Sequence, residues 1–329
     1  MTVCVTGGTG FVGGALVRRL LADRVPVRVL ARPSARADEL EARGAEVVRG
    51  SLADSEAVKR AVVGTESVYH VAAMVEAPGD TADFVDANLG GTERVFAECL
   101  TAHVPQVVYT SSIAVYGPTR EGEVITEDTP YDAALERRDS YAQSKILADK
   151  FAAEFSRKNG LPLVILRPGI VFGPGKALPI GLLGFRVGNT NVVFGKASHR
   201  FPLNYVENLV DALLLAGQSK QPGLRHYIVL DDDDLTLEWY HAARAEVDGS
   251  KAIFLLGWPV QAVGAIAEPV MRLLHVGQGV GFTKHQLRRS LQDRHYDTSR
   301  IRRELGWAPR VSLGDALRAC REGAGTGSG

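Results

Sequence analysis

The first half of the chain alternates short apolar runs with longer segments in which apolar residues recur every three or four positions. The runs predict strands at 2–6, 25–30, 46–48, 67–71, 106–111 and 163–167. The longer segments predict helices at 15–21, 54–63, 82–103 and 140–158. Because strands that alternate with helices form a parallel sheet covered on both faces, we expect an α/β fold with a doubly wound parallel sheet. Ligands of such sheets bind at the carboxyl ends of the strands.

A glycine-rich turn separates the first predicted strand from the first predicted helix. It reads Gly7-Gly8-Thr9-Gly10-Phe11-Val12-Gly13-Gly14. Glycines let a ligand approach the backbone, and the free N–H groups at a helix start bind anions. The turn therefore predicts a site for the pyrophosphate of a dinucleotide, with a glycine-rich surface turn as the alternative. The Gly-Lys-Ser/Thr ending of a nucleoside-triphosphate loop is missing.

In dinucleotide-binding proteins, the residues at the end of the second strand distinguish NAD(H) from NADP(H). A carboxylate there binds the ribose 2′-OH, whereas an arginine accommodates a 2′-phosphate. No acid stands at this position, and Arg32, Ser34 and Arg36 follow. The sequence favours NADP(H) over NAD(H), although Arg32 and Arg36 could equally be solvated charges that start the next helix.

Tyr141 and Lys145 lie four residues apart in the predicted helix 140–158, so their side chains share one face. A neighbouring cation favours the ionised phenol, and lowering a tyrosine pKa from about 10 by two or three units takes about 3 to 4 kcal/mol. We expect Lys145 and a positively charged nicotinamide to supply this jointly. Ser111 ends a predicted strand and Ser112 follows it, and a hydroxyl at this place can hold a substrate oxygen during proton transfer. Each feature alone also occurs by chance.

Composition narrows the class of protein. The 329 residues include 38 basic and 38 acidic side chains, and this zero net charge argues against a nucleic-acid partner. Cys4, Cys99 and Cys320 are odd in number and widely spaced, which indicates reduced thiols and no metal site. We expect a cytoplasmic protein without a signal peptide. The most apolar window, 252–271, is interrupted by Glu268 and by prolines and glycines, so no transmembrane segment is predicted.

Further motifs complete a pattern along almost the whole chain. They are Asp54, His70-Val71-Ala72-Ala73, Asn88-Leu89-Gly90-Gly91-Thr92, Arg167-Pro168-Gly169, Asp297-Thr298-Ser299 and Glu304-Leu305-Gly306-Trp307-Ala308-Pro309. With the glycine turn, Ser111-Ser112, Tyr141 and Lys145, this pattern resembles the extended short-chain dehydrogenase/reductase family, the NAD-dependent epimerase/dehydratase superfamily. The resemblance implies a Rossmann-type domain at 1–175 that also includes about 203–230. It also implies a smaller, mostly C-terminal substrate-binding domain at 176–202 and 231–322, and we expect a disordered tail at 323–329.

The same resemblance implies roles for individual residues. Ser112 would orient the substrate oxygen, Tyr141 would be the general acid/base, and Lys145 would bind the nicotinamide ribose. A homodimer would form through the predicted helices 82–103 and 140–158. Ser51 stands where the family has an acidic residue at the adenine site. The expected cofactor contacts are Gly7, Thr9, Gly10, Phe11, Val12, Gly13, Arg32, Ser34, Arg36, Ser51, Leu52, Ala72, Ala73, Asn88, Ser111, Tyr141, Lys145, Pro168, Gly169 and Ile170.

Residues that differ from the family pattern indicate which of the family's activities this chain has. The acid pair that dehydratases need after the active-site hydroxyl is replaced by Ile113 and Ala114. The asparagine by which nucleotide-sugar epimerases contact a diphosphate is replaced by Ile170. Arg200 matches an epimerase arginine, although it could be a surface cation, and the epimerases' Arg-Pro-Gly-Asp clamp is absent. We therefore expect a substrate without a diphosphate.

The second half of the chain is rich in apolar residues. An apolar stripe predicts a helix from 259 to about 275, which could be core, a lid over an apolar substrate or a peripheral membrane contact. This half is similar to the branch of 3β-hydroxysteroid dehydrogenases and dihydroflavonol-reductase-like proteins, which implies a bulky, apolar ketone or secondary alcohol. The run Asp231 to Asp234 is expected to be a solvated turn and helix cap, with a metal site as the alternative.

Together these patterns predict an NAD(P)-dependent oxidoreductase that transfers hydride between nicotinamide and a small-molecule ketone or alcohol. Two alternatives stay open. A nucleotide-sugar 4-epimerase would use the same residues with retained NAD. A non-catalytic dinucleotide sensor would need the glycine turn but not Tyr141.

Overall fold

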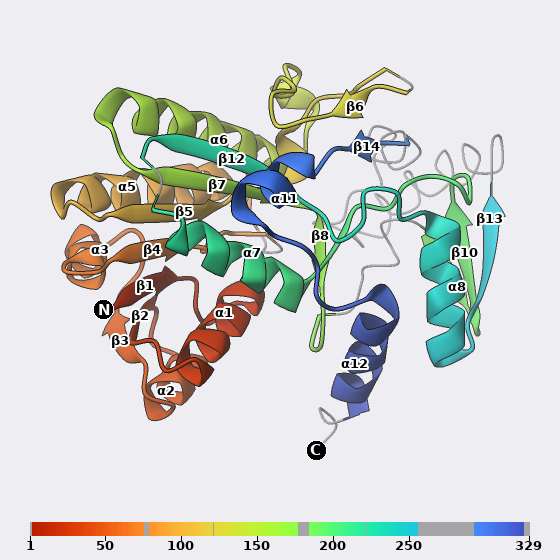
Figure 1. The fold of residues 1–329 in the computed structure, drawn as a ribbon, viewed down its shortest axis with the longest axis horizontal. Helices are drawn as coiled ribbons and strands as arrows, with labels where there is room; N and C mark the ends of the chain where they lie inside the picture. The colour runs from red at the N-terminus through yellow and green to blue at the C-terminus, as the bar shows by residue number, and fades with distance from the viewer. Residues whose placement is uncertain are drawn as a thin grey trace.

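Seven parallel strands form the main sheet of the computed structural model, in the order β12-β7-β5-β4-β1-β2-β3 (Figure 1). The structure describes residues 2–75, 79–120, 122–176, 184–220, 222–255 and 293–325. The strands are β1 (Val3–Thr6), β2 (Val27–Ala31), β3 (Glu46–Arg49), β4 (Ser67–His70), β5 (Gln106–Thr110), β7 (Leu163–Pro168) and β12 (Leu224–Val229). The chain order reverses between β1 and β4, and the crevice outside such a switch point is where open α/β sheets bind ligands.

Helices cover both faces of this sheet (Figure 1). One face packs against α1 (Phe11–Ala22), α2 (Ala35–Ala42) and α7 (Val206–Gln218). The other packs against α3 (Ser55–Val62), α5 (Gly91–Thr101) and α6 (Ser140–Asn159). Successive strand residues alternate between the two cores, as Val5 and Cys4 do, and both are fully buried. The predicted doubly wound, Rossmann-type sheet is confirmed.

Two predicted helices have different bounds in the structure. Helix α1 begins at Phe11 and not at residue 15, because Gly13 packs directly on the turn: a Cβ there would lie 2.2 Å from the Gly7 carbonyl oxygen. The single helix predicted at 82–103 is divided into α4 (Thr81–Val85), a π-helical segment η1 (Asp86–Gly90) and α5. The wider π turn contains Asn88, whose buried side chain bonds to neighbouring elements.

A smaller part lies beyond the main sheet, at the right of Figure 1. Its three-stranded sheet has the order β13-β10-β9. The elements are β9 (Gly184–Val187), β10 (Thr190–Phe194), α8 (Leu237–Asp248) and β13 (Lys251–Leu255). Short parallel pairs join β8 (Ile170–Phe172) to β11 (Leu203–Tyr205) and β6 (Val124–Ile125) to β14 (His295–Tyr296). The predicted helix at 259–275 falls outside the described residues.

The chain closes with α11 (Ser299–Leu305) and α12 (Leu313–Gly325). Helix α12 continues past Glu322, where the sequence predicts its end, because Gly323 packs against Pro174: a Cβ on Gly323 would lie 2.9 Å from the Pro174 Cβ. Within the described ranges no helix is long and apolar enough to cross a membrane.

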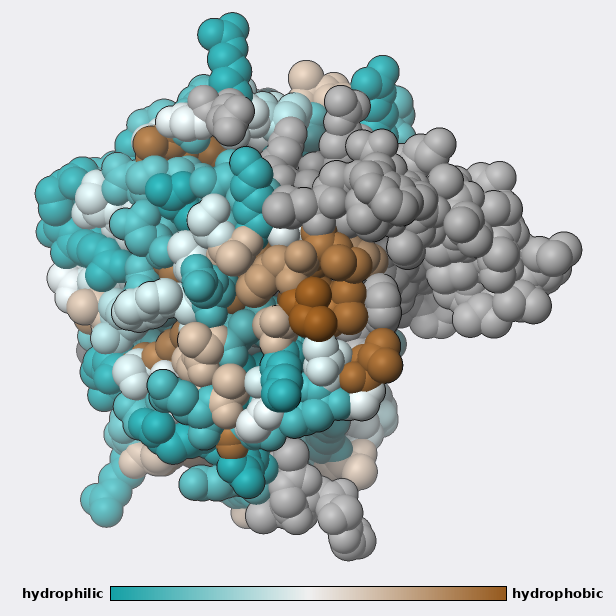
Figure 2. Space-filling model, turned by 90° about the vertical axis from the view of Figure 1, so that its right-hand side faces the viewer, coloured by the Kyte–Doolittle hydropathy of each residue, from teal (hydrophilic) through white to brown (hydrophobic). Residues whose placement is uncertain are grey.

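Figure 2 looks onto the side of the molecule that carries the three-stranded sheet in Figure 1. It shows a compact brown, apolar patch beside a mostly teal, hydrophilic surface. Among the exposed large hydrophobic residues, Val187 of β9 is 61% exposed and Ile253 of β13 is 53% exposed. The smaller part of the protein therefore presents apolar side chains to its surroundings.

Candidate active site

The glycine turn is shaped by close backbone contacts. Gly7 has a φ of +76°, which favours glycine, and a Cβ there would lie 2.7 Å from the backbone of Ala72 at the end of β4. Gly13 packs on the Gly7 carbonyl, as described above. Gly10 is exposed and is the N-cap of α1, where no side chain accepts from the first-turn N–H groups. This uncapped helix start beside two strand ends fits the pyrophosphate of a dinucleotide.

The residues that follow β2 lie beside this turn. Arg36 Nη1 donates a hydrogen bond to the carbonyl of Thr9 at 3.3 Å, so the arginine reaches from α2 to the glycine turn. The Ser34 hydroxyl accepts from the Ala37 backbone N–H and caps α2, and Arg32 is exposed. On the next strand end, Ser51 Oγ accepts from the Ala53 N–H at 3.2 Å. Contacts of these residues with a cofactor remain predictions.

Ser112, Tyr141 and Lys145 converge at the carboxyl end of β5. The segment after Ser112 packs against α6, and the Ser112 hydroxyl lies near enough to the Tyr141 phenol to lower its pKa. Ser112 Oγ accepts from the Ala114 N–H at 3.1 Å. Lys145 is 2% exposed, and its Nζ donates to the carbonyl of Thr110, the last residue of β5, at 2.9 Å. The helix that carries Tyr141 and Lys145 starts at Ser140 with Asp139 as its N-cap. The structure thus brings together three residues from two separate segments.

Burial governs the protonation of this group. It raises the pKa of Tyr141 to about 12, against the opposing effect of the nearby Ser112 hydroxyl. It lowers the pKa of Lys145 to about 8, against the opposing charge of Asp149. The lowering of this pKa that the sequence predicts requires Lys145 and a bound nicotinamide together, and it stays a prediction. In the protein itself burial is the largest influence on Tyr141, and the Lys145 ammonium is bound to the Thr110 carbonyl.

A buried polar network supports Lys145 from one turn further along α6. Arg167 donates to both carboxylate oxygens of Asp149, at 3.0 and 2.7 Å, and to the phenol oxygens of Tyr116 and Tyr131, at 2.8 and 3.1 Å. Burial opposes the ionised form of Asp149, but the charge and hydrogen bonds of Arg167 outweigh it and hold the pKa of Asp149 below its usual value. Sequence reasoning singled out Arg167 only as part of a motif and missed Asp149, although Asp149 follows Lys145 at helical spacing.

Asn88 ties the loop after β4 to α6. Its Oδ1 accepts from the Met74 N–H at 2.7 Å, and its Nδ2 donates to the Met74 carbonyl at 3.0 Å and to the Ser144 hydroxyl at 2.8 Å. Asn88 is 3% exposed. The structure therefore gives this residue a clear role in holding the loop that contains Ala72 and Ala73, while its predicted cofactor contact remains a prediction.

The turn after β7 is held equally tightly. The Gly169 N–H donates to Asn204 Oδ1 at 2.8 Å, and the Ile170 N–H donates to the Pro202 carbonyl at 2.9 Å. A Cβ on Gly169 would lie 2.5 Å from the Pro202 carbonyl oxygen. The segment Pro168 to Ile170 is thus fixed at the same edge of the sheet as Ser112.

The acidic run Asp231 to Asp234 is not simply the solvated helix cap that the sequence predicts. Asp231 accepts from the Tyr205 N–H at 2.7 Å, and burial raises its pKa to about 6. Asp233 accepts from the Thr298 hydroxyl at 2.7 Å. Helix α8 is capped by Thr236 instead, because the carboxylates are taken up by tertiary contacts. In the part of the chain that the structure describes, no group of three metal-ligating side chains occurs.

Arg200 is engaged in two ion pairs. Its guanidinium lies 2.6 Å from Asp293 and 3.2 Å from Asp234. The epimerase-like role considered for Arg200 would require it to exchange these carboxylates for a phosphate.

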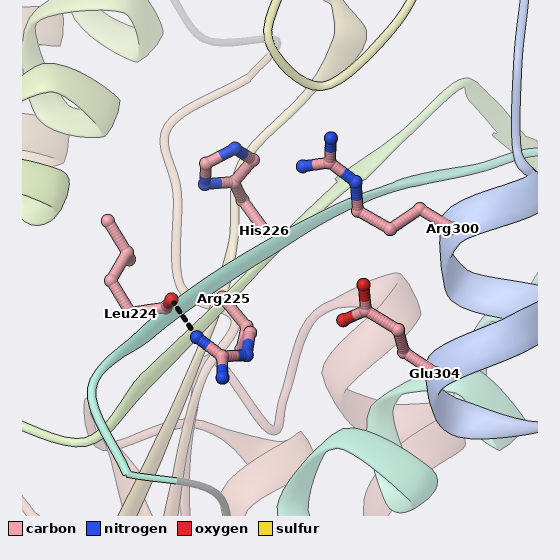
Figure 3. Close-up of a pocket in the computed structure, with 5 residues that line it drawn as sticks. All are labelled: Leu224, Arg225, His226, Arg300 and Glu304. Atoms are coloured by element: carbon pink, nitrogen blue, oxygen red, sulfur yellow. Dashed lines mark hydrogen bonds between the residues drawn. The ribbon is translucent and has the colours of Figure 1, made fainter.

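A cavity of about 430 Å³ lies elsewhere, at the start of β12 (Figure 3). It is lined by Leu224, Arg225, His226, Arg300 and Glu304. Figure 3 shows the side chain of Arg225 to the left of Glu304 and that of Arg300 above it, so side chains of both charge signs line the cavity. Because the amino ends of parallel strands lie opposite their carboxyl ends, this cavity is remote from Ser112 and Tyr141 and is not their substrate site.

The sheet with its switch point, the uncapped glycine turn and the serine–tyrosine–lysine group define a Rossmann-type α/β protein with ionisable side chains gathered at the carboxyl edge of its sheet. The chain belongs to the NAD dependent epimerase/dehydratase family, whose sequence pattern matches residues 3–229. The family resemblance drawn from the sequence is confirmed.

Several relatives cover almost the whole chain. A 2-alkyl-3-oxoalkanoate reductase of Stenotrophomonas maltophilia is 29% identical over 328 residues, which are 97% of this chain and 98% of the relative. A 4-hydroxy-2-methyl-3-oxo-4-farnesyl-3,4-dihydroquinoline-1-oxide ketoreductase of Stigmatella aurantiaca is 28% identical and covers 100% and 98% of the two chains. A 3 beta-hydroxysteroid dehydrogenase/Delta 5-->4-isomerase of Mycobacterium tuberculosis is 27% identical and covers 97% and 89%.

Solved structures share the fold. The crystal structure of gox2253 superposes with a TM-score of 0.80 at 25% identity, covering 99% of this chain and 98% of the other. A UDP-glucose 4-epimerase of Thermotoga maritima with UDP-glucose has a TM-score of 0.73 at 22% identity, covering 98% of each chain. A UDP-glucuronic acid 4-epimerase of Bacillus cereus in complex with NAD has a TM-score of 0.71 at 18% identity, covering 97% of each. At these lower identities the likeness concerns the fold alone.

Proposed function

We propose that the protein is an NAD(P)-dependent reductase of a bulky, apolar ketone, with Tyr141 as general acid. The observation that carries the proposal is the convergence of Ser112, Tyr141 and the buried Lys145 at the carboxyl end of β5, the sheet edge that also holds the glycine turn. A dinucleotide sensor has no need of a phenol, a hydroxyl and an ammonium in this arrangement.

The chain's own groups account for the proton that a ketone reduction consumes. A bound nicotinamide cofactor supplies the hydride to the carbonyl carbon. Ser112 donates a hydrogen bond to the carbonyl oxygen, and Tyr141 transfers its phenolic proton to that oxygen as the alkoxide forms. With a pKa of about 12, Tyr141 is protonated at neutral pH and ready to act as an acid. Lys145 stabilises the phenolate that is left and returns a proton to it.

We propose NADP(H) as the preferred cofactor. Exposed Arg32 and Arg36 follow β2, and Arg36 already lies against the glycine turn. We expect Arg32→Ala and Arg36→Ala to weaken NADPH binding by about tenfold or more each, with little effect on NADH, because a guanidinium–phosphate hydrogen bond contributes about 1.5 to 3 kcal/mol. Arg43→Ala, at the other end of α2, is the matched control. Equal losses for both cofactors would contradict the preference. Fluorescence titration measures both affinities.

The proposed substrate class is supported by apolar side chains and by the relatives' activities. Ile113, Ala114 and Ile170 stand where dehydratases and epimerases carry polar groups, and Arg200 is occupied by two carboxylates. The relatives include reductases named for a 2-alkyl-3-oxoalkanoate and for a farnesylated quinoline ketone. We therefore propose a ketone that bears an extended apolar group and no diphosphate.

A substrate screen tests this function. The purified protein is incubated with NADPH or NADH and with a 2-alkyl-3-oxoalkanoate, a 3-oxosteroid or UDP-glucose. The expected result is NADPH consumption, in stoichiometry with alcohol formed, for an apolar ketone. Conversion of UDP-glucose to its 4-epimer without net consumption of cofactor would identify an epimerase instead. Cofactor binding without turnover of any compound would favour a sensor.

A further inference from the structure

Two buried side chains that the sequence did not single out lie between the Ser112 loop and the start of α6. Arg138 and Asp132 form an ion pair with 2.6 Å between Nη1 and Oδ2. Their side chains are 1% and 4% exposed. Arg138 directly precedes Asp139, the N-cap of α6, and stands three residues before Tyr141. A charged pair so deeply buried at the edge of the catalytic group needs an explanation, because burying charges is costly.

Arg138 and Asp132 together hold the backbone that follows Ser112. Arg138 Nη2 donates to the Ala114 carbonyl at 2.6 Å, and Nη1 donates to the Tyr116 carbonyl at 3.3 Å. The backbone N–H of Asp132 donates to the Val115 carbonyl between them, at 3.0 Å. Three successive carbonyl groups, which would otherwise be buried without partners, are thus bound by one segment.

These contacts connect Ser112 to the start of the helix that carries Tyr141. The N–H of Ala114 is bonded to Ser112 Oγ, and its carbonyl is bonded to Arg138. The segment after Ser112 also packs against α6, the helix that carries Tyr141, and Tyr141 follows Arg138 on the chain. The position of Ser112 relative to Tyr141 therefore depends on the distance between Arg138 and Ala114.

We propose that Arg138 is a positioning residue that sets the position of Ser112 relative to Tyr141 by clamping the Ser112 loop to the start of α6. The effect on turnover rests on the proposed reductase function, whereas the effect on the position of Ser112 does not. A guanidinium suits this task because its planar fork donates to two carbonyls and a carboxylate at once. A lysine ammonium keeps the charge but lacks that fixed geometry.

Arg28 offers a matched control. It also bonds backbone carbonyls, including that of Val63 at 2.8 Å, and pairs with Glu46 at 2.8 Å. It lies near the start of β2, at the opposite edge of the sheet from Ser112. Arg28→Gln therefore removes a similar arginine without touching the catalytic group.

The test compares Arg138→Lys, the double variant Arg138→Gln/Asp132→Asn and Arg28→Gln with the wild type. The double variant removes both charges, so that no carboxylate is left buried without its partner. Protein labelled with ¹³C at tyrosine Cζ reports the Tyr141 phenol, whose signal among the nine tyrosines is assigned by its loss in Tyr141→Phe. Ser112→Ala gives the signal of Tyr141 without the neighbouring serine hydroxyl.

We expect both Arg138 variants to move the Tyr141 signal towards its position in Ser112→Ala, and Arg28→Gln to leave it in place. In turnover of the apolar ketone, kcat should fall about 10- to 100-fold, as for a misplaced reacting group, while the affinity for NADPH changes less than about twofold. Because Arg138 acts through Ser112, adding Arg138→Lys to Ser112→Ala should lower kcat no further.

The outcomes separate the two proposals. A wild-type Tyr141 signal in both Arg138 variants would overturn the clamp. Independent, multiplying losses of kcat in Arg138→Lys/Ser112→Ala would also overturn it, because a general loss of stability would have that signature. A shifted signal in a protein that reduces no ketone supports the clamp and overturns the reductase function.

Discussion

Tyr141 and Lys145 show how burial sets the chemistry of single residues. Burial favours the neutral form of both side chains. It raises the pKa of the Tyr141 phenol and lowers the pKa of the Lys145 ammonium. The protonated phenol suits proton donation during reduction. The buried ammonium is retained at a cost in stability, which a catalytic role would explain.

The cost of burying Lys145 gives a prediction about pH. Its pKa is lowered from 10.5 to about 8, so between these values the unfolded chain still binds a proton that the folded protein has released. Stability therefore rises with pH across this window, by about 1.4 kcal/mol per pH unit at most, and the full penalty applies below pH 8. From pH 8 to 10.5 we expect wild-type protein to gain about 2 to 3 kcal/mol of unfolding free energy relative to Lys145→Met, by urea denaturation. A constant difference would contradict the lowered pKa.

Individual site residues could be predicted where a chemical role shows in the local pattern. The glycine turn and the Tyr141–Lys145 spacing are of this kind. Arg138, Asp132 and Asp149 could not be found this way, because their partners are distant in sequence or are backbone groups. The direction of the Tyr141 pKa also depends on burial, which spacing does not reveal.

At the scale of elements, the positions of the proposed catalytic side chains depend on the contacts between the ends of helices and strands. The π-helical segment η1 interrupts the helix between α4 and α5, and Asn88 within it bonds Met74 and Ser144. Six of the seven strands of the main sheet could be predicted to within about two residues, because buried parallel strands are continuous apolar runs, whereas the bounds of β12 were not predicted. The π segment could not, because the contacts that favour it are tertiary.

Removing the Asn88 side chain should therefore destabilise the protein. Asn88→Ala leaves the Met74 N–H and carbonyl without their partner, and we expect the unfolding free energy to fall by about 2 to 3 kcal/mol. Asn159→Ala, at the exposed end of α6, is the matched control and should cost less than about 0.5 kcal/mol. Chemical denaturation of the two variants measures the difference. Equal, small losses would show that Asn88 does not hold the loop.

Contacts between elements also cover the outer edge of the main sheet at β12. Strand β12 is an edge strand, and its outward-facing groups are partly covered. Glu127 Oε1 accepts from the Ile228 N–H at 3.1 Å, and Arg225 Nη1 donates to the Leu224 carbonyl at 3.1 Å. These contacts protect the edge against pairing with another strand.

For the whole molecule, we propose a homodimer through α5 and α6. These helices lie together on one side of the main sheet in Figure 1. Leu147 and Phe151 of α6 are only partly buried, and Leu147 does not belong to the apolar side chains packed on the cores of the described residues. A second copy would cover them.

A charge at Leu147 tests this arrangement. Leu147→Glu should convert the protein from dimer to monomer at micromolar concentration, because an unpaired carboxylate would be buried in the interface. Val63→Glu, a change at an apolar residue that is 50% exposed elsewhere, is the control and should leave the mass unchanged. Light scattering during gel filtration gives the mass. A monomeric wild type, or a dimeric Leu147→Glu, would contradict the proposed interface.

Architecture was the most predictable property at this largest scale, because strand–helix alternation alone implies a doubly wound sheet. The contacts that charged residues make in the second half of the chain could not be predicted. Asp231, Asp233 and Arg200 look like surface charges in sequence, yet the fold joins them to groups far along the chain, such as Thr298 and Asp293.

Turnover of Tyr141→Phe tests the central claim most directly. Single-turnover reduction of an apolar ketone by NADPH should be slower than in the wild type by about 10² to 10⁴, the loss typical of a missing general acid, while the NADPH dissociation constant stays within about twofold. A phenylalanine variant that reduces the ketone at the wild-type rate would contradict the role of Tyr141 and, with it, this account of the site.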